Sequence, residues 1–297
     1  MSILNTFQFI FSHPITKIRK IAAFKRWLRW QLGSRIISGS SALQFVENSR
    51  LLAQPGMTGA TGNIYCGLHE PNDMGFLLHF LREKDLFMDV GANIGSYTVL
   101  ASGVIGAETI CFEPIPTTYQ HLLDNIYLNR LVDRVQALNV AVGSEEGEIE
   151  MMADQDTVNR VVAAGEYSGL TIKVPVVTVD KILDGRVPKL IKIDVEGYET
   201  LVLESAKQTL ENKALEAVII ELNGSGSVLG FDEDSIRRHF IDLGFTACTY
   251  DVRTRLLQEE NDEIKNISDN TLYVRNIEAT QDRLRHARYF NVLGANI

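Results

Sequence analysis

Residues 86–98 place an acidic side chain and two spaced glycines directly after a short apolar run. The run predicts a buried strand that ends near Asp89, and the loop after it lets the backbone approach a ligand at the carboxyl end of that strand. A dinucleotide-binding loop has three glycines, whereas here Gly91 and Gly95 flank Asn93 at the middle position. Because the Asp89 carboxylate would repel a phosphate and attract an ammonium group, the loop favours an amino-acid-bearing nucleoside without phosphates.

A second acidic residue, Glu113, stands 22 residues after the first glycine of this loop, at the end of the apolar run 109–112. An acidic side chain at the tip of the second strand can accept hydrogen bonds from both hydroxyls of a ribose. The glycine loop alone is also compatible with a tight structural turn, but the spacing to Glu113 favours a binding site. S-adenosylmethionine fits both ends, with its ribose at Glu113 and its amino-acid portion at the loop that contains Asp89.

A pair of carboxylates closes another apolar strand, in residues 191–197, Ile-Lys-Ile-Asp-Val-Glu-Gly. On an extended chain, residues two apart point to the same side, so Asp194 and Glu196 project together. If this strand neighbours that of Asp89, both carboxylates reach the crevice in which a sulfonium would lie, and Asp194 joins the cofactor contacts. Three alternatives stay open: Asp194 completes a turn, Glu196 caps the next helix, or the pair holds a divalent metal. Because oxygen sites usually draw on more than two ligands, we predict no metal.

Methyl transfer to a hydroxyl requires alignment of the acceptor and a base that takes its proton. Alignment of the acceptor with the methyl group can contribute ~7–11 kcal/mol, and a carboxylate with a raised pKa can take the hydroxyl proton. Glu196 is the first candidate, because it lies further from the predicted cofactor pocket than Asp194. His69, in the turn formed by residues 67–70, is the second, although a lone histidine there can also be purely structural.

The composition indicates one large α/β domain with an appendage, or two small domains, in 297 residues. An apolar content of 45% predicts an ordinary core, and a net charge of −9 argues against a nucleic-acid partner. Cys66, Cys111 and Cys248 form no paired motif, and the six histidines lack the spacing of a zinc site. This cysteine usage suits a reducing compartment, so we expect a cytoplasmic protein.

Positive charge gathers at the beginning of the chain, because residues 1–46 contain seven Lys or Arg and no Asp or Glu. Residues 15–32 predict a basic helix with an apolar face that Lys25 interrupts and that consists of Ile18, Ile21, Leu28 and Leu32. Such a helix can lie on the anionic inner face of a membrane or contact a glycolipid; the alternative is that it packs on the main domain. No apolar run reaches the roughly 18–20 residues that span a bilayer.

From residue 86 onward, strand and helix patterns alternate, which predicts a parallel sheet with right-handed crossovers. The predicted strands are 86–90, 109–112, 135–138, 173–179, 188–194 and 217–221, with an antiparallel edge of 245–250 and 271–275. The predicted helices are 73–81, 95–103, 117–129, 198–210 and 232–243. Turn-forming residues predict a hairpin over 50–69 and an edge hairpin or lid over 145–172, whereas the last twenty residues show no clear core face.

Three segments together resemble the FkbM family of S-adenosylmethionine-dependent methyltransferases: residues 88–95 (Met-Asp-Val-Gly-Ala-Asn-Ile-Gly), 112–114 (Phe-Glu-Pro) and 191–197. Residues 125–129, Asn-Ile-Tyr-Leu-Asn, are similar to a helix ending of the same family. The resemblance extends over residues 84–223, about half of the chain.

The resemblance implies a Rossmann-like class I methyltransferase fold, α/β, with a mostly parallel sheet, helices on both faces and an antiparallel edge. Members of the family methylate hydroxyls of sugars, polyketides or other small metabolites, so it implies a saccharide, glycolipid or similar acceptor and leaves the base unassigned. The implied cofactor contacts are Asp89, Gly91, Asn93, Gly95 and Glu113, with Asn139 and Ala141 near the adenine. We accordingly divide the chain into a basic helical N-terminal extension (1–49), a methyltransferase domain (50–276) and a C-terminal tail (277–297).

Two other functions stay open at this point. A nicotinamide-dependent oxidoreductase needs a loop that accepts a pyrophosphate, which Asn93 and Asp89 disfavour. A non-catalytic module for cofactor binding or membrane recruitment could use the same fold without turnover.

Overall fold

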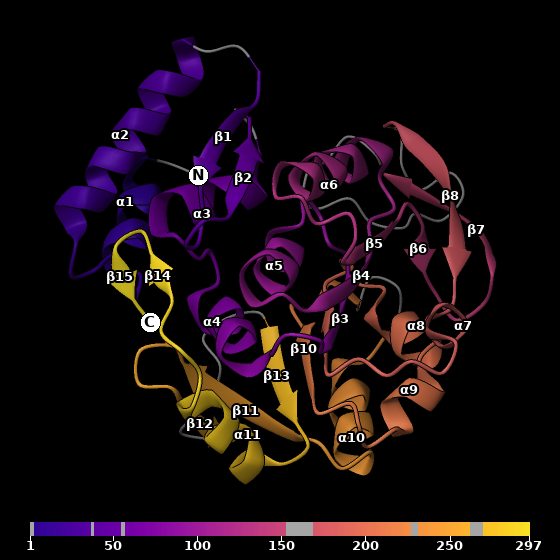
Figure 1. Cartoon of the computed structure of the whole chain (residues 1–297). Helices are drawn as coiled ribbons and strands as arrows, with labels where there is room; N and C mark the ends of the chain where they lie inside the picture. The colour runs from indigo at the N-terminus through magenta and orange to yellow at the C-terminus, as the bar shows by residue number, and fades with distance from the viewer. Residues whose placement is uncertain (1–2, 37–38, 55–56, 153–168, 227–230, 262–269) are drawn as a thin grey trace.

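The computed structural model describes residues 3–36, 39–54, 57–152, 169–226, 231–261 and 270–297 (Figure 1). Within these residues, the centre of the molecule is an eight-stranded sheet in the order β12-β11-β13-β10-β9-β3-β4-β5. Its strands are β3 Leu86–Val90, β4 Glu108–Phe112, β5 Val135–Leu138, β9 Leu190–Ile193, β10 Ala217–Glu221, β11 Thr246–Asp251, β12 Leu256–Glu259 and β13 Asn270–Val274. The strands from β10 to β5 are mutually parallel, whereas β13 runs antiparallel to both β10 and β11. The predicted fold class, a Rossmann-like sheet with an antiparallel edge, is confirmed.

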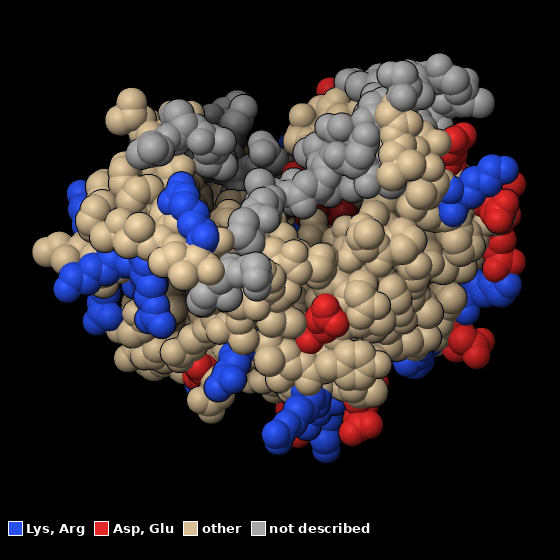
Figure 2. All heavy atoms as spheres, turned by 90° about the horizontal axis from the view of Figure 1, so that it is seen from above, with Lys and Arg blue, Asp and Glu red and all other residues tan. Residues whose placement is uncertain are grey.

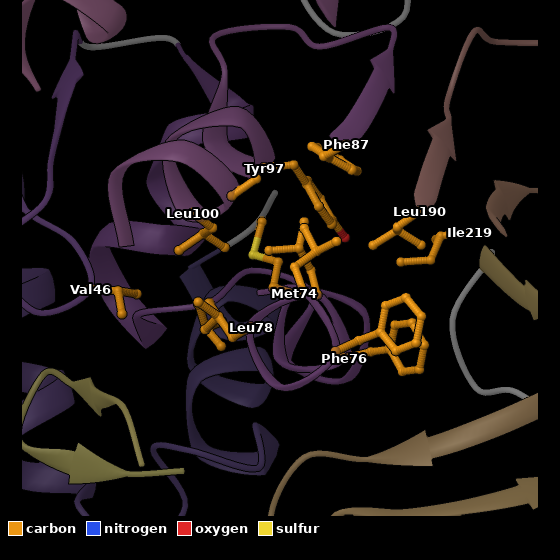
Figure 3. Close-up of a cluster of buried hydrophobic side chains, with 14 of the residues drawn as sticks. Val46, Met74, Phe76, Leu78, Phe87, Tyr97, Leu100, Leu190 and Ile219 are labelled. Atoms are coloured by element: carbon orange, nitrogen blue, oxygen red, sulfur yellow. The ribbon is translucent and has the colours of Figure 1, made fainter. Parts of the chain in front are cut away.

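Side chains along the central strands alternate between two helical layers, because successive residues of a strand point to opposite faces. Phe87 and Ile219 pack on one face, against α4 Pro71–Phe80, α6 Pro116–Leu128 and α11 Ile277–Arg285. Figure 3 shows part of this layer, with Met74 of α4 close to the sheet. Met88 and Ile110 pack on the other face, against α7 Val179–Leu183, α8 Glu199–Glu204, α9 Lys207–Glu211 and α10 Glu233–Asp242.

The strand order reverses between β3 and β9, since β4 and β5 lie on one side of β3 while β9 and β10 lie on the other. The register pairs Asp89 with Lys192 and Val90 with Ile193, so the two strands end side by side, as predicted. At such a switch point the loops diverge and leave a crevice at the carboxyl ends of the strands. The helix after β3 begins as α5 Ser96–Thr98 and continues as the π-helix η1 Val99–Ile105, over the residues predicted to be helical.

The predicted hairpin over residues 50–69 is wrong. The hairpin lies earlier, where β1 Ser41–Gln44 pairs antiparallel with β2 Arg50–Ala53, and the Gly- and Thr-rich segment forms helix α3 Thr58–Cys66. Tertiary packing outweighs local turn chemistry here, because the small residues allow a close approach: a Cβ atom at Gly62 would lie 1.9 Å from Nδ1 of His69.

Two helices, rather than one over residues 15–32, begin the chain: α1 Ile3–Ser12 and α2 Lys20–Ile36. The turn that contains Pro14 separates the two helices and extends past residue 15, so α2 begins at Lys20, later than predicted. The helix does pack on the rest of the protein, as the alternative predicts, but not through the predicted apolar face, because Ile21, Leu32 and the rest of that face are exposed. Instead, α2 buries Trp30 and Ala23 on its opposite side.

Two further differences concern the second half of the chain. The predicted helix 198–210 is split into α8 and α9, because the carbonyl of Ser205 accepts a hydrogen bond from the amide of Asp180 in α7 (3.1 Å). A hairpin does form within 145–172, but β7 Gly147–Met152 and β8 Thr171–Val177 join β6 Ala141–Val142 in a separate sheet, and residues 153–168 lie outside the described residues.

The final segment has a core face, contrary to expectation. Leu284, Phe290 and Ile297 are buried in the main cluster, and β14 Asn291–Val292 pairs with β15 Ala295–Asn296. The predicted boundaries of the extension, domain and tail stay a prediction. Among the helices described, none combines the length and the apolar character needed to cross a bilayer.

Candidate active site

A cavity of about 590 Å³ lies at the carboxyl ends of β3, β4, β9 and β10. Its volume falls within the range of small-ligand sites. The predicted site residues that line it are Asp89, Gly91, Asn93, Glu113, Ala141, Asp194, Glu196 and His69. Sequence positions more than a hundred residues apart therefore meet in one place, as expected at the switch point of an α/β sheet.

The carboxylate of Glu113 connects the tip of β4 to the glycine loop. Its Oε2 accepts a hydrogen bond from the amide of Asn93 (3.0 Å), and its Oε1 accepts one from the amide of Ile115 (2.9 Å). Burial raises the pKa of Glu113 to about 7, although both amide hydrogen bonds favour its charged form. Each carboxylate oxygen keeps a further lone pair, so the group is oriented and can still accept a ligand hydroxyl.

Asn139 binds the backbone next to this carboxylate. Its side-chain amide donates to the carbonyls of Glu113 (2.8 Å) and Pro114 (2.9 Å). The described lining of the cavity contains its neighbour Ala141 but not Asn139 itself. This side-chain amide therefore holds the loop after β4 in place, and a contact of Asn139 with the adenine stays a prediction.

Glycine is required at Gly91 and Gly95, for two different reasons. Gly91 has a φ of 82°, and a Cβ atom there would lie 1.7 Å from the carbonyl oxygen of Asp194, so the loop passes directly over the end of β9. Gly95, with a φ of 87°, begins α5, and a Cβ atom would lie 2.5 Å from Leu122 of α6. Gly95 is absent from the described cavity lining, so in this structure it serves helix packing.

Asp89 is buried at the end of β3, with 1% of its surface exposed. Its Oδ2 accepts a hydrogen bond from Oγ1 of Thr98 (2.7 Å), which ties the strand to the helix after the loop. Burial raises the pKa of Asp89 to about 6, while Lys192 and Thr98 oppose that rise. At neutral pH the ionised form therefore predominates, and a negative charge faces the cavity.

Lys192 is a site residue that the sequence analysis missed. Its side chain is 3% exposed, its Nζ lies 2.5 Å from Oδ2 of Asp194, and it lies 4.7 Å from the ring centroid of Tyr97. Burial alone would lower the pKa of Lys192, but the carboxylates of Asp194, Glu70 and Asp89 raise it. The cavity thus contains a permanent cation that balances part of its acidic lining.

Three carboxylates, those of Asp194, Glu196 and Glu221, have oxygens within 4.8 Å of one another. Asp194 and Glu196 do come together, but in a turn rather than on an extended strand, because Glu196 has a φ of 53°. Burial raises the pKa of Glu196 to about 7 and that of Glu221 well above its usual range, with the Asp194 charge adding to both shifts. The pKa of Asp194 is lowered by Lys192 in spite of burial.

The cluster therefore distributes its protons unevenly: Asp194 is ionised, Glu221 carries a proton at neutral pH, and Glu196 titrates near neutrality. Three oxygens at this spacing are compatible with a divalent metal. However, Lys192 already supplies a positive partner to Asp194. The absence of a metal stays a prediction.

His69 lines the cavity beside the N-terminal helices. Its Nδ1 is buried and has no hydrogen-bond partner among the described residues, and its ring centroid lies 5.5 Å from that of Phe9 in α1. Further lining residues come from α1 and α3, namely Thr6, Thr61, Gly62 and Tyr65. This wall was not predicted, since these residues belong to no motif.

Two of the missed residues did leave a signal in the sequence. Lys192 is a single charge within an otherwise apolar strand, where burial demands a partner. Glu221 ends an apolar run, as Glu113 does, and so stands at the same edge of the sheet. Both patterns can be recognised in the sequence, but neither shows which side chain Lys192 or Glu221 contacts.

The fold and the site together define a class I, Rossmann-like methyltransferase architecture, with a nucleoside-sized cavity at the switch point and acidic strand tips around it. A family model described as the methyltransferase FkbM domain matches residues 89–251, and the chain belongs to this family. Membership indicates S-adenosylmethionine as the cofactor, in agreement with the sequence prediction.

A curated relative is the hexuronic acid methyltransferase AglP of Haloferax volcanii, which is 30% identical over 157 residues. The alignment includes 52% of this chain and 62% of that protein. Among solved structures, an rRNA methylase from Streptococcus thermophilus is 12% identical, with a TM-score of 0.39 over 68% of this chain and 91% of that chain. The TrmK protein of M. capricolum, bound to S-adenosyl-homocysteine, is 8% identical, with a TM-score of 0.38 over 68% and 66% of the two chains.

Proposed function

We propose that this protein is an S-adenosylmethionine-dependent methyltransferase that methylates a hydroxyl of a saccharide, glycolipid or similar small metabolite. The observation that carries the proposal is the single cavity that Glu113, the loop after β3 and Glu196 line together. Family membership favours this activity over a nicotinamide-dependent oxidoreductase.

The residues present fit the cofactor. Glu113 would accept the ribose hydroxyls, since its carboxylate is already oriented by the amides of Asn93 and Ile115. Asp89 would attract the ammonium end of the amino-acid portion, and the loop at Gly91 leaves backbone rather than side chains against the ligand. When bound, S-adenosylmethionine supplies an electrophilic methyl group on a positively charged sulfur.

Glu196 would take the proton of the acceptor hydroxyl. A pKa near 7 keeps a useful fraction of this carboxylate ionised at neutral pH while leaving it basic enough to accept a proton. Asp194 is engaged by Lys192, and Glu221 holds a proton, so both are poorer bases at neutral pH. His69, with its unpartnered Nδ1, is the second candidate.

The acceptor side of the cavity would be formed by the N-terminal helices. Phe9 of α1 and Tyr65 of α3 present aromatic surface there, which suits the apolar face of a sugar ring, and Thr6 adds a hydroxyl. The name of the relative AglP, a hexuronic acid methyltransferase, supports a saccharide as the class of acceptor. The role of these residues in specificity is part of the proposal.

Two measurements test the proposed function in sequence. Isothermal titration with S-adenosylmethionine should show binding, and no binding at high micromolar cofactor would overturn the assignment. Transfer of a labelled methyl group from the cofactor to a panel of neutral glycosides, uronosides and glycolipids should then identify the acceptor, with the O-methyl product located by mass spectrometry. Cofactor binding without turnover on any of these acceptors would favour the non-catalytic module.

A further inference from the structure

Exposed apolar side chains gather on one helix of the N-terminal extension. Of the thirteen large hydrophobic side chains that are exposed among the described residues, seven lie before residue 37. Five of these follow one side of α2, are between 39% and 82% exposed, and form what we call the α2 outer face: Ile21, Phe24, Leu28, Leu32 and Ile36. Their spacing of three or four residues places them on one stripe of the helix.

This face is directed away from the body of the protein. The opposite side of α2 buries Ala23 and Trp30, and the guanidinium of Arg26 donates to the carbonyl of Tyr65 in α3 at 2.9 and 3.1 Å. The helix is therefore apolar on two sides. Packing on the described residues accounts for the apolar side chains of the inner side, whereas those of the outer side remain exposed.

Positive charges lie beside and within the α2 outer face: by helical spacing Lys20 and Arg29 flank it, and Lys25 and Arg35 fall among its apolar side chains. Lys20, Lys25, Arg29 and Arg35 are exposed on the same helix, and the first 46 residues contain no acidic residue, although the whole chain carries a net charge of −9. Figure 2 shows Lys and Arg side chains at the left of the molecule, where α1 and α2 lie in Figure 1. Apolar side chains interspersed with long Lys and Arg side chains are complementary to an anionic bilayer surface, because the apolar groups enter the interface while the cations extend to the headgroups.

Aromatic rings extend this face toward α1. Phe24 and Trp27 of α2 lie 5.8 Å apart, and Phe7 of α1 lies 4.7 Å from Trp27 (ring centroids). Tryptophan and other amphipathic aromatic side chains concentrate at membrane interfaces. A second copy of this chain is a poorer occupant, because a two-fold pairing of this face would bring the same cations together.

We propose that the α2 outer face binds the surface of an anionic membrane and holds the protein there peripherally. The adjoining helix α1 contributes Thr6 and Phe9 to the wall of the cavity, so docking would bring the acceptor side of the site close to the bilayer. A lipid-linked saccharide would then reach the site without leaving the membrane. Only this last consequence rests on the proposed function.

Vesicle sedimentation with the full-length chain tests the proposal. The protein should sediment with phosphatidylcholine vesicles that contain 30% phosphatidylglycerol, only weakly with pure phosphatidylcholine, and less at raised salt. The double variant Ile21→Glu/Leu32→Glu should lower the partition coefficient at least ~tenfold, because each lost apolar side chain and each added negative charge disfavours the interface. Ile241→Glu, at an exposed apolar position on α10, is the matched control and should bind as the wild type does.

The outcomes separate this proposal from its rivals and from the proposed function. Equal sedimentation with neutral and anionic vesicles, or no loss in the double variant, would overturn it. Absence of vesicle binding together with dimerisation that the double variant abolishes would instead identify a second copy as the partner. Cofactor binding, measured by titration on the same three proteins, should be equal, and its failure would bear on the proposed function alone.

Discussion

The ammonium group of Lys192 lies 2.5 Å from the carboxylate of Asp194, two residues further along the same strand and its exit loop. The lysine of this ion pair is buried and the aspartate is partly exposed, and the pair sets the charge balance of the cavity, because it keeps Asp194 ionised beside two further carboxyl groups. The proton that the cluster retains consequently resides on Glu221, and Glu196 is left to titrate near pH 7.

Replacement of Lys192 by methionine should destabilise the protein by about 2 kcal/mol, because the partly exposed carboxylate of Asp194 would lose its charged hydrogen-bond partner. Urea denaturation at pH 8 measures the loss. Lys189→Met is the matched control, since Lys189 pairs with Glu216 at a more exposed position (2.7 Å) and should cost less than about 1 kcal/mol. Equal losses of unfolding free energy in the two variants would show that the ion pair with Asp194 contributes no more to stability than the pair with Glu216.

Replacement of Glu113 by glutamine should weaken the binding of S-adenosylmethionine roughly tenfold or more, because a charged acceptor of hydrogen bonds is lost at the ribose. Binding should also weaken as the pH falls below about 7, since burial raises the pKa of Glu113 and the ionised form is the stronger acceptor. Isothermal titration between pH 6 and 8 measures both effects. Glu108→Gln, at the exposed beginning of the same strand, should bind normally; unchanged binding by Glu113→Gln would remove this residue from the cofactor site.

Replacement of Glu196 by glutamine should lower kcat ~100-fold or more while cofactor affinity stays close to that of the wild type, as expected of a general base. The wild-type rate should rise with pH through an apparent pKa near 7, because the base works in its deprotonated form and burial raises its pKa to about that value. Steady-state rates between pH 5.5 and 8.5 test this. Glu204→Gln on α8 serves as the exposed control, and His69→Gln would show the larger fall in kcat if the histidine is the base.

Replacement of Gly91 by alanine should destabilise the fold by at least about 2 kcal/mol, since the new Cβ would lie 1.7 Å from a carbonyl oxygen in a backbone of positive φ. Gly147→Ala provides the comparison, because nothing lies within 4 Å of a Cβ atom there, and should change stability by less than ~0.5 kcal/mol. Thermal unfolding of both variants decides the matter. An equal fall of the unfolding temperature in both variants would mean that the loop over β9 can move enough to accommodate a Cβ atom at residue 91.

Local patterns in the sequence were sufficient for the central strands and their acidic tips. After their first residues, β3 and β4 are buried at every position, as continuous apolar runs in a parallel sheet covered on both faces predict, and an acid at the end of such a run falls at the ligand edge of the sheet. Asp89 and Glu113 do line the cavity, and their contact with a cofactor stays a prediction. Reasoning from local patterns failed at residues 50–69, where turn-forming residues build helix α3 because they allow close packing against His69.

Spacing along short segments was enough to predict the class of fold, the glycine loop after β3 and most of the acidic residues that line the cavity beside it. The arrangement in space shows, beyond this, that Glu221 joins Asp194 and Glu196, that Lys192 pairs with Asp194, and that α1 and α3 form part of the cavity wall. These relationships depend on strand order and on the packing of distant helices. Such contacts join residues far apart in the sequence and form only when the whole core packs, so no local sequence pattern predicts them.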